Sequence, residues 1–242
     1  MRKVLIATPS YDGKLDVWYV NALTESIRLG LANDIFFQPI YMSYDALVQR
    51  ARNDLLAIAV ENDFDDIIWI DSDMEWHPQW LLQLLSYEED VVGGACVKKS
   101  VEEQYNVKCQ PENLIQNEKG LIEIEGIGTG FLRMSRKAYM SLWKKSLPYK
   151  SNGAERRWAF EVKMTNGEIV SEDITACDKL RKAGFKIYLD PNITCNHIGT
   201  LKFTGNFKQF MTYFIKPAEE VTDINVKRLV KKNTPTKKRA TS

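Results

Sequence analysis

The stretch Ile67-Ile68-Trp69-Ile70-Asp71-Ser72-Asp73 decides the fold class of this chain. Its first four residues are apolar, which is typical of a strand buried on both faces, and two carboxylates follow directly. Because side chains two apart in an extended chain share a face, Asp71 and Asp73 are expected to point the same way. Two like charges at a strand end repel each other unless a cation lies between them, and a divalent cation with oxygen ligands suits such a pair. The alternative is a pair of solvated loop acids.

The first 95 residues alternate between strand-like and helix-like segments. Strands are expected at 3–7, 35–40, 66–70 and 90–93, and helices at 16–31, 44–60 and 79–87. This alternation predicts an α/β fold, with a Rossmann-like, mostly parallel central sheet flanked by helices. Such sheets bind ligands at the carboxyl ends of their strands, which is where Asp71 and Asp73 fall, so the order of elements favours the metal site.

The rest of the chain is less regular. A hairpin is expected within 105–125, a glycine turn at 126–130, strands at 131–134, 185–189 and 193–195, and helices at 136–145, 172–183 and 206–215. We therefore expect one domain with a regular α/β half at 1–95 and a smaller, mixed half at 96–216. The basic segment 217–242 is expected to be a flexible tail. Peripheral contact with an anionic membrane surface is the alternative for this tail.

Composition excludes several classes of protein. The chain has 242 residues, 44% of them hydrophobic and 27% charged, and a net charge of +1, which gives no reason to expect a nucleic-acid partner. No apolar run approaches the roughly 18 residues of a membrane span. The four cysteines form no CxxC pair, so we expect reduced thiols, no zinc site and a cytoplasmic protein.

Two segments before the acidic pair could bind a nucleotide. The loop Thr8-Pro9-Ser10-Tyr11-Asp12 follows the first strand and should lie at the same sheet edge as Asp73. Tyr11 could stack on a base there, although Pro, Ser, Asp and Gly also make an ordinary turn. Arg52 and Asn53 offer a charged fork and an amide suited to phosphate or base edges, and the alternative is a solvated helix face.

Three later features could carry chemistry. In Ser171-Glu172-Asp173 the acids would open a helix, where the macrodipole favours them whatever their role, and Asp173 could act as a general base. His197 lies between a short strand and a glycine and could be a third metal ligand, although a lone histidine is more often structural. Trp76, just past the acidic pair, could stack on a sugar, although tryptophan more often packs in a core. Lys98 and Lys99, after Gly93-Gly94, could contact a phosphate or the donor sugar, although surface lysines are the preferred interpretation.

The order of these motifs resembles a GT-A-fold glycosyltransferase that uses a nucleotide-sugar donor, small viral and bacterial members included. The motifs are a TPSYD loop, ARN on a helix, a strand ending in DSD, a GTGF turn, an ED pair and an HIG. The resemblance covers roughly residues 3–215. It implies a nucleoside-diphosphate-sugar donor, a glycan or other hydroxyl acceptor, and Mn²⁺ or Mg²⁺. It also implies that the half at 1–95 binds the nucleotide sugar and that the half at 96–216 binds the acceptor and is catalytic.

The resemblance also implies a role for each motif. Asp71, Ser72 and Asp73 would hold the metal and the donor diphosphate, with His197 as a late metal ligand. The nucleoside would lie against Thr8, Pro9, Tyr11, Arg52 and Asn53. The acceptor pocket would be lined by Gly128, Thr129 and Gly130, with Trp76 beside them. Asp173 would deprotonate the acceptor hydroxyl, which favours inversion at the anomeric carbon.

Two rival functions stay open from the sequence. A nucleotidyltransferase can use a similar sheet and acidic pair, but the loop after the first strand has only one glycine and little net charge. A catalytically inactive nucleotide- or carbohydrate-binding module is the other alternative. It would gain support if Asp173 were held in a structural ion pair away from the cleft.

Overall fold

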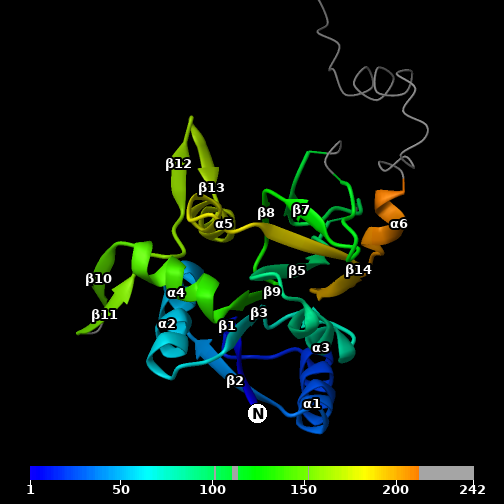
Figure 1. The fold of residues 1–242 in the computed structure, drawn as a ribbon, viewed down its shortest axis with the longest axis horizontal. Helices are drawn as coiled ribbons and strands as arrows, with labels where there is room; N and C mark the ends of the chain where they lie inside the picture. Colours follow the sequence, from blue (N-terminus) through cyan, green and yellow to red (C-terminus); the bar gives the residue numbers. More distant parts are fainter. Residues whose placement is uncertain (101, 111–113, 152, 213–242) are drawn as a thin grey trace, which may run out of the picture.

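The central sheet is mixed, and its middle strand comes from the second half of the chain (Figure 1). The structure is a computed structural model that describes residues 1–100, 102–110, 114–151 and 153–212, so the expected tail at 217–242 lies outside it. Along the main path of the sheet the strands follow the order β15-β14-β5-β9-β3-β1-β2. Their bounds are β15 (Lys202–Phe203), β14 (Ile187–Ile198), β5 (Val91–Cys96), β9 (Phe131–Ser135), β3 (Asp66–Ile70), β1 (Arg2–Ser10) and β2 (Ile35–Ser43). Two short strands, β4 (Met74–Glu75) and β7 (Ile122–Ile124), also pair with β14.

The sheet is mixed and not mostly parallel as predicted, and the short strands β4, β7 and β15 pair antiparallel with β14. Strand β1 pairs in parallel with β2 and β3, and β14 pairs in parallel with β5, but β9 lies antiparallel between β3 and β5. A strand buried on both faces has the same continuous apolar pattern in either direction, so the sequence of 131–134 does not reveal its orientation. The α/β alternation of the first 95 residues is confirmed.

Helices cover both faces of the sheet. They are α1 (Val17–Ala32), α2 (Val48–Glu61), α3 (Gln79–Ser86), α4 (Arg136–Lys145), α5 (Glu172–Lys182) and α6 (Phe207–Met211). Alternate residues of β1 enter different cores: Val4 and Ile6 pack with side chains of α1 and α3, whereas Leu5 and Ala7 pack with those of α2, α4 and α5. This is the alternation expected of a strand covered on both sides.

Three expected elements differ from the structure. The segment 105–125 is no simple hairpin, because β6 (Val107–Lys108) pairs with β8 (Gly126–Ile127) and β7 pairs with β14. The two short strands expected at 185–195 are one strand, β14, with a register shift between Asp190 and Thr194 where a proline interrupts the ladder. Two further hairpins, β10 (Pro148–Ser151) with β11 (Ala154–Arg157) and β12 (Lys163–Thr165) with β13 (Glu168–Val170), lie apart from the central sheet (Figure 1).

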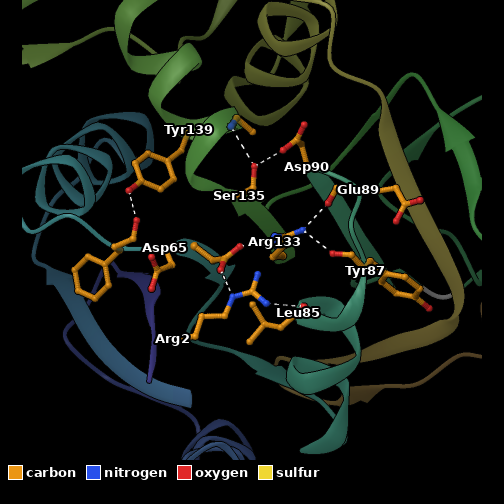
Figure 2. A network of polar contacts seen from close by, with 12 residues as sticks. Arg2, Asp65, Leu85, Tyr87, Glu89, Asp90, Arg133, Ser135 and Tyr139 are labelled. Carbon is orange, nitrogen blue, oxygen red and sulfur yellow. Dashed lines mark hydrogen bonds and ion pairs between the residues drawn. The ribbon is translucent and has the colours of Figure 1, made fainter. Parts of the chain in front are cut away.

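A buried ion-pair network fixes β9 in the middle of the sheet (Figure 2). Asp66, at the start of β3, is 1% exposed and accepts hydrogen bonds from Arg2 Nε at 2.6 Å and Arg133 Nε at 2.7 Å. Arg133 lies on β9 and also donates to the carbonyl oxygen of Glu89, just before β5. The network therefore joins the amino-terminal ends of β1 and β3 to β9 and to the start of β5, away from the edge where β3 ends.

No helix in the part of the chain that the structure describes is long and apolar enough to cross a membrane. The four cysteines, all within that part, are free thiols.

Candidate active site

Four strands deliver their carboxyl ends to one edge of the sheet. Strands β1, β3, β5 and β14 run in the same direction, so the segments that follow or close them meet there: 9–11, 71–73, 97–99 and 197. Because β9 runs the opposite way, it begins at this edge, and the glycine turn 128–130 that precedes it joins the group. The backbone N–H of Asp71 donates to the carbonyl oxygen of Gly130 at 3.4 Å. The sheet direction alone thus assembles most of the predicted motifs.

Two pockets of about 310 Å³ each adjoin at this edge and share Asp71 and His197 on their walls. We call the first the loop pocket, because the loop after β1 and the start of α2 form much of it. Its lining includes Pro9, Ser10, Tyr11, Asp45, Gln49, Arg52, Ser72 and Asp73. We call the second the glycine-turn pocket, and its lining includes Lys98, Lys99, Asn106, Gly128, Thr129, Gly130 and Asp173.

Arg52 lies between the two acidic motifs. Its Nη2 donates to Asp71 Oδ1 at 2.9 Å, and its Nε lies 3.4 Å from Glu172 Oε1, in the first turn of α5. Burial lowers the pKa of the Arg52 guanidinium, but the charges of Asp71, Glu172 and Asp173 outweigh that effect and raise it. Arg52 is therefore a permanently charged link between the end of β3 and the start of α5.

Asp73 lies on the other side of the edge, between two basic side chains. Its Oδ2 is 2.6 Å from Lys99 Nζ and 3.3 Å from His197 Nε2. Burial acts to raise the pKa of the Asp73 carboxyl, but hydrogen bonds and charge from His197 and Lys99 outweigh it and hold the pKa below its ordinary value. His197 reaches this position because β14 pairs with β4, and the N–H of Ile198 donates to the Asp73 carbonyl oxygen at 2.8 Å.

The chemistry of Asp73 and His197 fits a divalent cation. His197 Nδ1 lies 3.0 Å from the carbonyl oxygen of Val97. A carbonyl only accepts, so Nδ1 carries a proton, and this bond fixes the ring with Nε2 toward the Asp73 carboxylate, the orientation in which a histidine can share a metal with that carboxylate. Throughout the described ranges, however, no three His, Cys, Asp or Glu side chains converge as a metal-holding group. The structure brings His197 to Asp73 but pairs Asp71 with Arg52 instead.

Asp173 lies in the wall of the glycine-turn pocket, as a residue that is only 7% exposed. Its Oδ1 accepts a hydrogen bond from the N–H of Ile174 at 2.7 Å and another from the Ser171 hydroxyl, and its Oδ2 accepts one from Asn106 Nδ2 at 3.2 Å. Ser171 makes no side-chain capping bond to the helix backbone. No ion pair to Asp173 is found among the described residues, and the residue lies in the cleft, so the condition that favours an inactive module is not met.

Three residues assigned to the site by the sequence lie in the core instead. Trp76 is 4% exposed, packs edge-on against Tyr19 and donates from Nε1 to Ser26 at 3.1 Å, so no ring face is free for a sugar. Asn53 is fully buried and binds the backbone of Ala159 and Phe160. Thr8 is also buried, and its hydroxyl bonds that of Tyr19. These three assignments are corrected: each residue supports the walls without lining the pockets.

The structure adds three residues that the sequence analysis did not assign to the site, although it had considered Lys99 as a phosphate or sugar contact and Glu172 as part of the acidic motif. Lys99 contacts Asp73, Glu172 contacts Arg52, and Asn106 contacts Asp173. Lys99 sits three residues past the end of a parallel strand, and that position could have marked it. Asn106 lies in a loop, and no local pattern distinguishes it.

Two pocket-lining residues each carry a buried polar atom without a protein partner among the described residues. Among the described residues, none makes a hydrogen bond with Nη1 of Arg52 or Oγ1 of Thr129. Arg52 lines the loop pocket and Thr129 the glycine-turn pocket. A buried donor or acceptor left unsatisfied costs about 1–3 kcal/mol, so each of these atoms needs a further partner such as a water or a ligand.

No protein-family model and no curated protein sequence matches this chain. Solved structures do. A197 from STIV is 18% identical, with a TM-score of 0.52, and the match covers 82% of this chain and 86% of A197. GalNAc-T7, determined with UDP, GalNAc and Mn²⁺, has a TM-score of 0.45 and 11% identity over 83% of this chain and 44% of that chain.

The inositol-1-phosphate CTP transferase from T. maritima has a TM-score of 0.41 and 13% identity, over 82% of this chain and 89% of that chain. The structural neighbours thus include glycosyltransferases and nucleotidyltransferases. The likeness to A197 shows a shared fold. What the chain does must be argued from its site.

Proposed function

We propose that this chain is a metal-dependent glycosyltransferase that moves a sugar from a nucleoside-diphosphate sugar to an acceptor hydroxyl, with inversion. One observation carries the proposal. The acidic pair at the end of β3 and the carboxylate of Asp173 border the same adjoining pockets, and Asp71 and Asp173 line one of them together. A donor held at Asp71 and Asp73 therefore has its reacting end within the pocket that Asp173 faces.

The loop pocket suits the nucleotide. Tyr11 is 74% exposed at its rim and can stack on a base, and the unpartnered Nη1 of Arg52 can donate to a ribose or sugar oxygen. Asp73 and His197 would hold Mn²⁺ or Mg²⁺ beside Ser72, and the donor diphosphate would supply further oxygen ligands. When bound, such a cation stabilises the negative charge that builds on the leaving nucleoside diphosphate. Lys99, which contacts Asp73, can then turn to a phosphate oxygen.

The glycine-turn pocket suits the acceptor. Gly128, Thr129 and Gly130 form one wall, and Thr129 Oγ1 is free to bond an acceptor oxygen. Asp173 Oδ2, which accepts only the Asn106 amide within the described chain, keeps a lone pair for the acceptor hydroxyl. The hydroxyl oxygen attacks the anomeric carbon as its proton passes to Asp173, and the bond from that carbon to the diphosphate oxygen breaks with its electron pair. One displacement of this kind inverts the anomeric centre.

The two halves of the chain have different roles in this reaction. Residues 1–95 supply the loop pocket and the acidic pair, and 96–216 supply the glycine turn, Asp173 and His197. Both halves contribute strands to the same sheet, so they act as one domain.

The test is to incubate the protein with Mn²⁺ and a panel of nucleotide sugars and to measure the products. We expect release of a nucleoside diphosphate from one donor, by slow transfer to water when no acceptor is present. Chelation of the metal and Asp73→Ala should each abolish the release.

Two other results would reject the proposal. Release of pyrophosphate from a nucleoside triphosphate and a sugar phosphate would identify a nucleotidyltransferase. Donor binding without turnover, under every acceptor tried, would identify a binding module.

A further inference from the structure

We infer that Asn106 is a positioning residue that orients Asp173, and that residue 128 is glycine because the Asn106 amide occupies the space a side chain would fill. The inference rests on the proposed function for its catalytic meaning. The contact between the three residues can be tested without any substrate.

The carboxylate of Asp173 is held from both sides. The Ser171 hydroxyl and the N–H of Ile174 both donate to Oδ1, and both groups belong to the start of α5, where Asp173 itself lies. Among the described residues only Asn106 donates to Oδ2, and it comes from a loop 67 residues earlier in the chain. Removing the Asn106 amide would leave Oδ1 anchored but would let the plane of the carboxylate rotate, and Oδ2 is the oxygen that faces the acceptor.

The backbone of Asn106 is fixed independently of its side chain. Its N–H donates to the carbonyl oxygen of Cys96 at 3.3 Å, and its own carbonyl accepts from the N–H of Gly128 at 2.9 Å. The next residue, Val107, pairs with Ile127 in the β6–β8 ladder. Because these bonds hold the loop, the side-chain amide is not needed for that purpose and is available to Asp173.

Gly128 is required by space. A Cβ at this position would lie 2.1 Å from Asn106 Nδ2 and 2.8 Å from its Cγ. The φ angle of Gly128 does not fall in the left-handed region, so the backbone accepts any residue there. An alanine would therefore push out the end of the Asn106 side chain, which is the part that bonds Asp173.

The contact can be measured by NMR on protein labelled with ¹⁵N. The side-chain amide signals of Asn106 are those missing from the Asn106→Ala spectrum. We expect these signals to shift in Asp173→Asn and again in Gly128→Ala. Gln104→Ala is the control and should leave the Asn106 signals in place, because this side chain on the same loop is exposed and the loop bond that the residue accepts, from the Lys98 N–H, goes to its backbone carbonyl. Asn106 side-chain amide signals with unchanged chemical shifts in either Asp173→Asn or Gly128→Ala would overturn the inference.

The catalytic consequence is measured with the donor found above. Asn106→Ala and Gly128→Ala should each lower kcat by about 10- to 100-fold, the scale of a misplaced catalytic group, with little change in the donor KM. The double variant should lose no more than either single variant, because both changes remove the same contact. A loss of donor affinity instead of kcat, or losses that multiply in the double variant, would contradict the positioning role.

The two failures are distinguishable. If the unmodified protein releases no nucleoside diphosphate from any donor, the proposed glycosyl transfer fails. The chemical shifts of the Asn106 amide then test, without any substrate, whether the space at Gly128 lets Asn106 contact Asp173.

Discussion

Asp173 combines burial with an oxygen that still has a lone pair available. Its neighbours are hydrogen-bond donors and no cation pairs with it in the described chain, so it can accept a proton from a substrate. We expect Asp173→Asn to leave donor binding nearly unchanged and to lower turnover by about 10²–10⁴-fold, the usual contribution of a general base. Steady-state kinetics and donor titration by calorimetry measure the two effects. Asp178→Asn, on the outer turn of the same helix, is the matched control, and a loss below about threefold in Asp173→Asn would remove Asp173 from this role.

Lys99 competes with a cation for Asp73. Its ammonium lies 2.6 Å from Asp73 Oδ2, the oxygen that also faces His197. We expect Lys99→Met to strengthen binding of Mn²⁺ alone by up to about fivefold, the equivalent of ~1 kcal/mol for a half-exposed ion pair. Calorimetry without nucleotide measures this affinity. Lys98→Met should leave it unchanged, and weaker Mn²⁺ binding in Lys99→Met would contradict this account of the contact.

The sequence located acidic residues better than their partners. Asp71, Asp73 and Asp173 were found because each follows a strand or opens a helix, and those positions are visible as local patterns. His197 was placed next to Asp73 by the same reasoning. Asn106 was missed because its importance depends on a contact with a residue far away in the sequence, which a local pattern does not encode.

At the scale of elements, β9 depends on a buried charge. Asp66 and Arg133 are both almost fully buried, and Asp66 has no other way to satisfy its charge than the two arginines. We expect Asp66→Ala to lower the free energy of unfolding by about 3–5 kcal/mol, because Arg133 would remain buried and unpaired. Urea denaturation measures the loss.

The control for this prediction is an exposed pair on the same side of the molecule. Arg136 and Asp63 form an ion pair at the surface. Arg136→Met, which removes the pair without changing Asp63 and its left-handed backbone, should change the free energy of unfolding by about 1 kcal/mol or less. Equal losses in the two variants would show that burial of the Asp66 network does not set the stability.

The sequence predicted that β9 is a strand but did not predict its direction. Residues 131–134 were expected to form a strand and do so, but their apolar run fits either orientation. Arg133 within that run is the residue that could have raised the question, because a charge in a doubly covered strand requires a partner. Its partner Asp66 opens the predicted strand at 66–70.

At the scale of the whole molecule, the antiparallel direction of β9 places the glycine turn next to Asp71. A parallel strand in its place would begin at the far edge, and the glycine turn would lie away from Asp71. Because β9 is reversed, the turn 128–130 lies beside the acidic pair and completes the wall opposite Asp173. The α/β class and the ligand-binding edge were thus predictable, whereas the joining of the two halves into one site depended on a reversal that the sequence does not display.

The central claim is that a cation and a diphosphate bind beside Asp73 and His197, within reach of Asp173. Anomalous diffraction from a crystal grown with Mn²⁺ and a nucleoside diphosphate tests it most directly. We expect a manganese peak in contact with Asp73 and His197, with the nucleoside in the loop pocket and an open glycine-turn pocket in front of Asp173. A manganese ion bound elsewhere, or a nucleotide bound outside the loop pocket, would contradict the account.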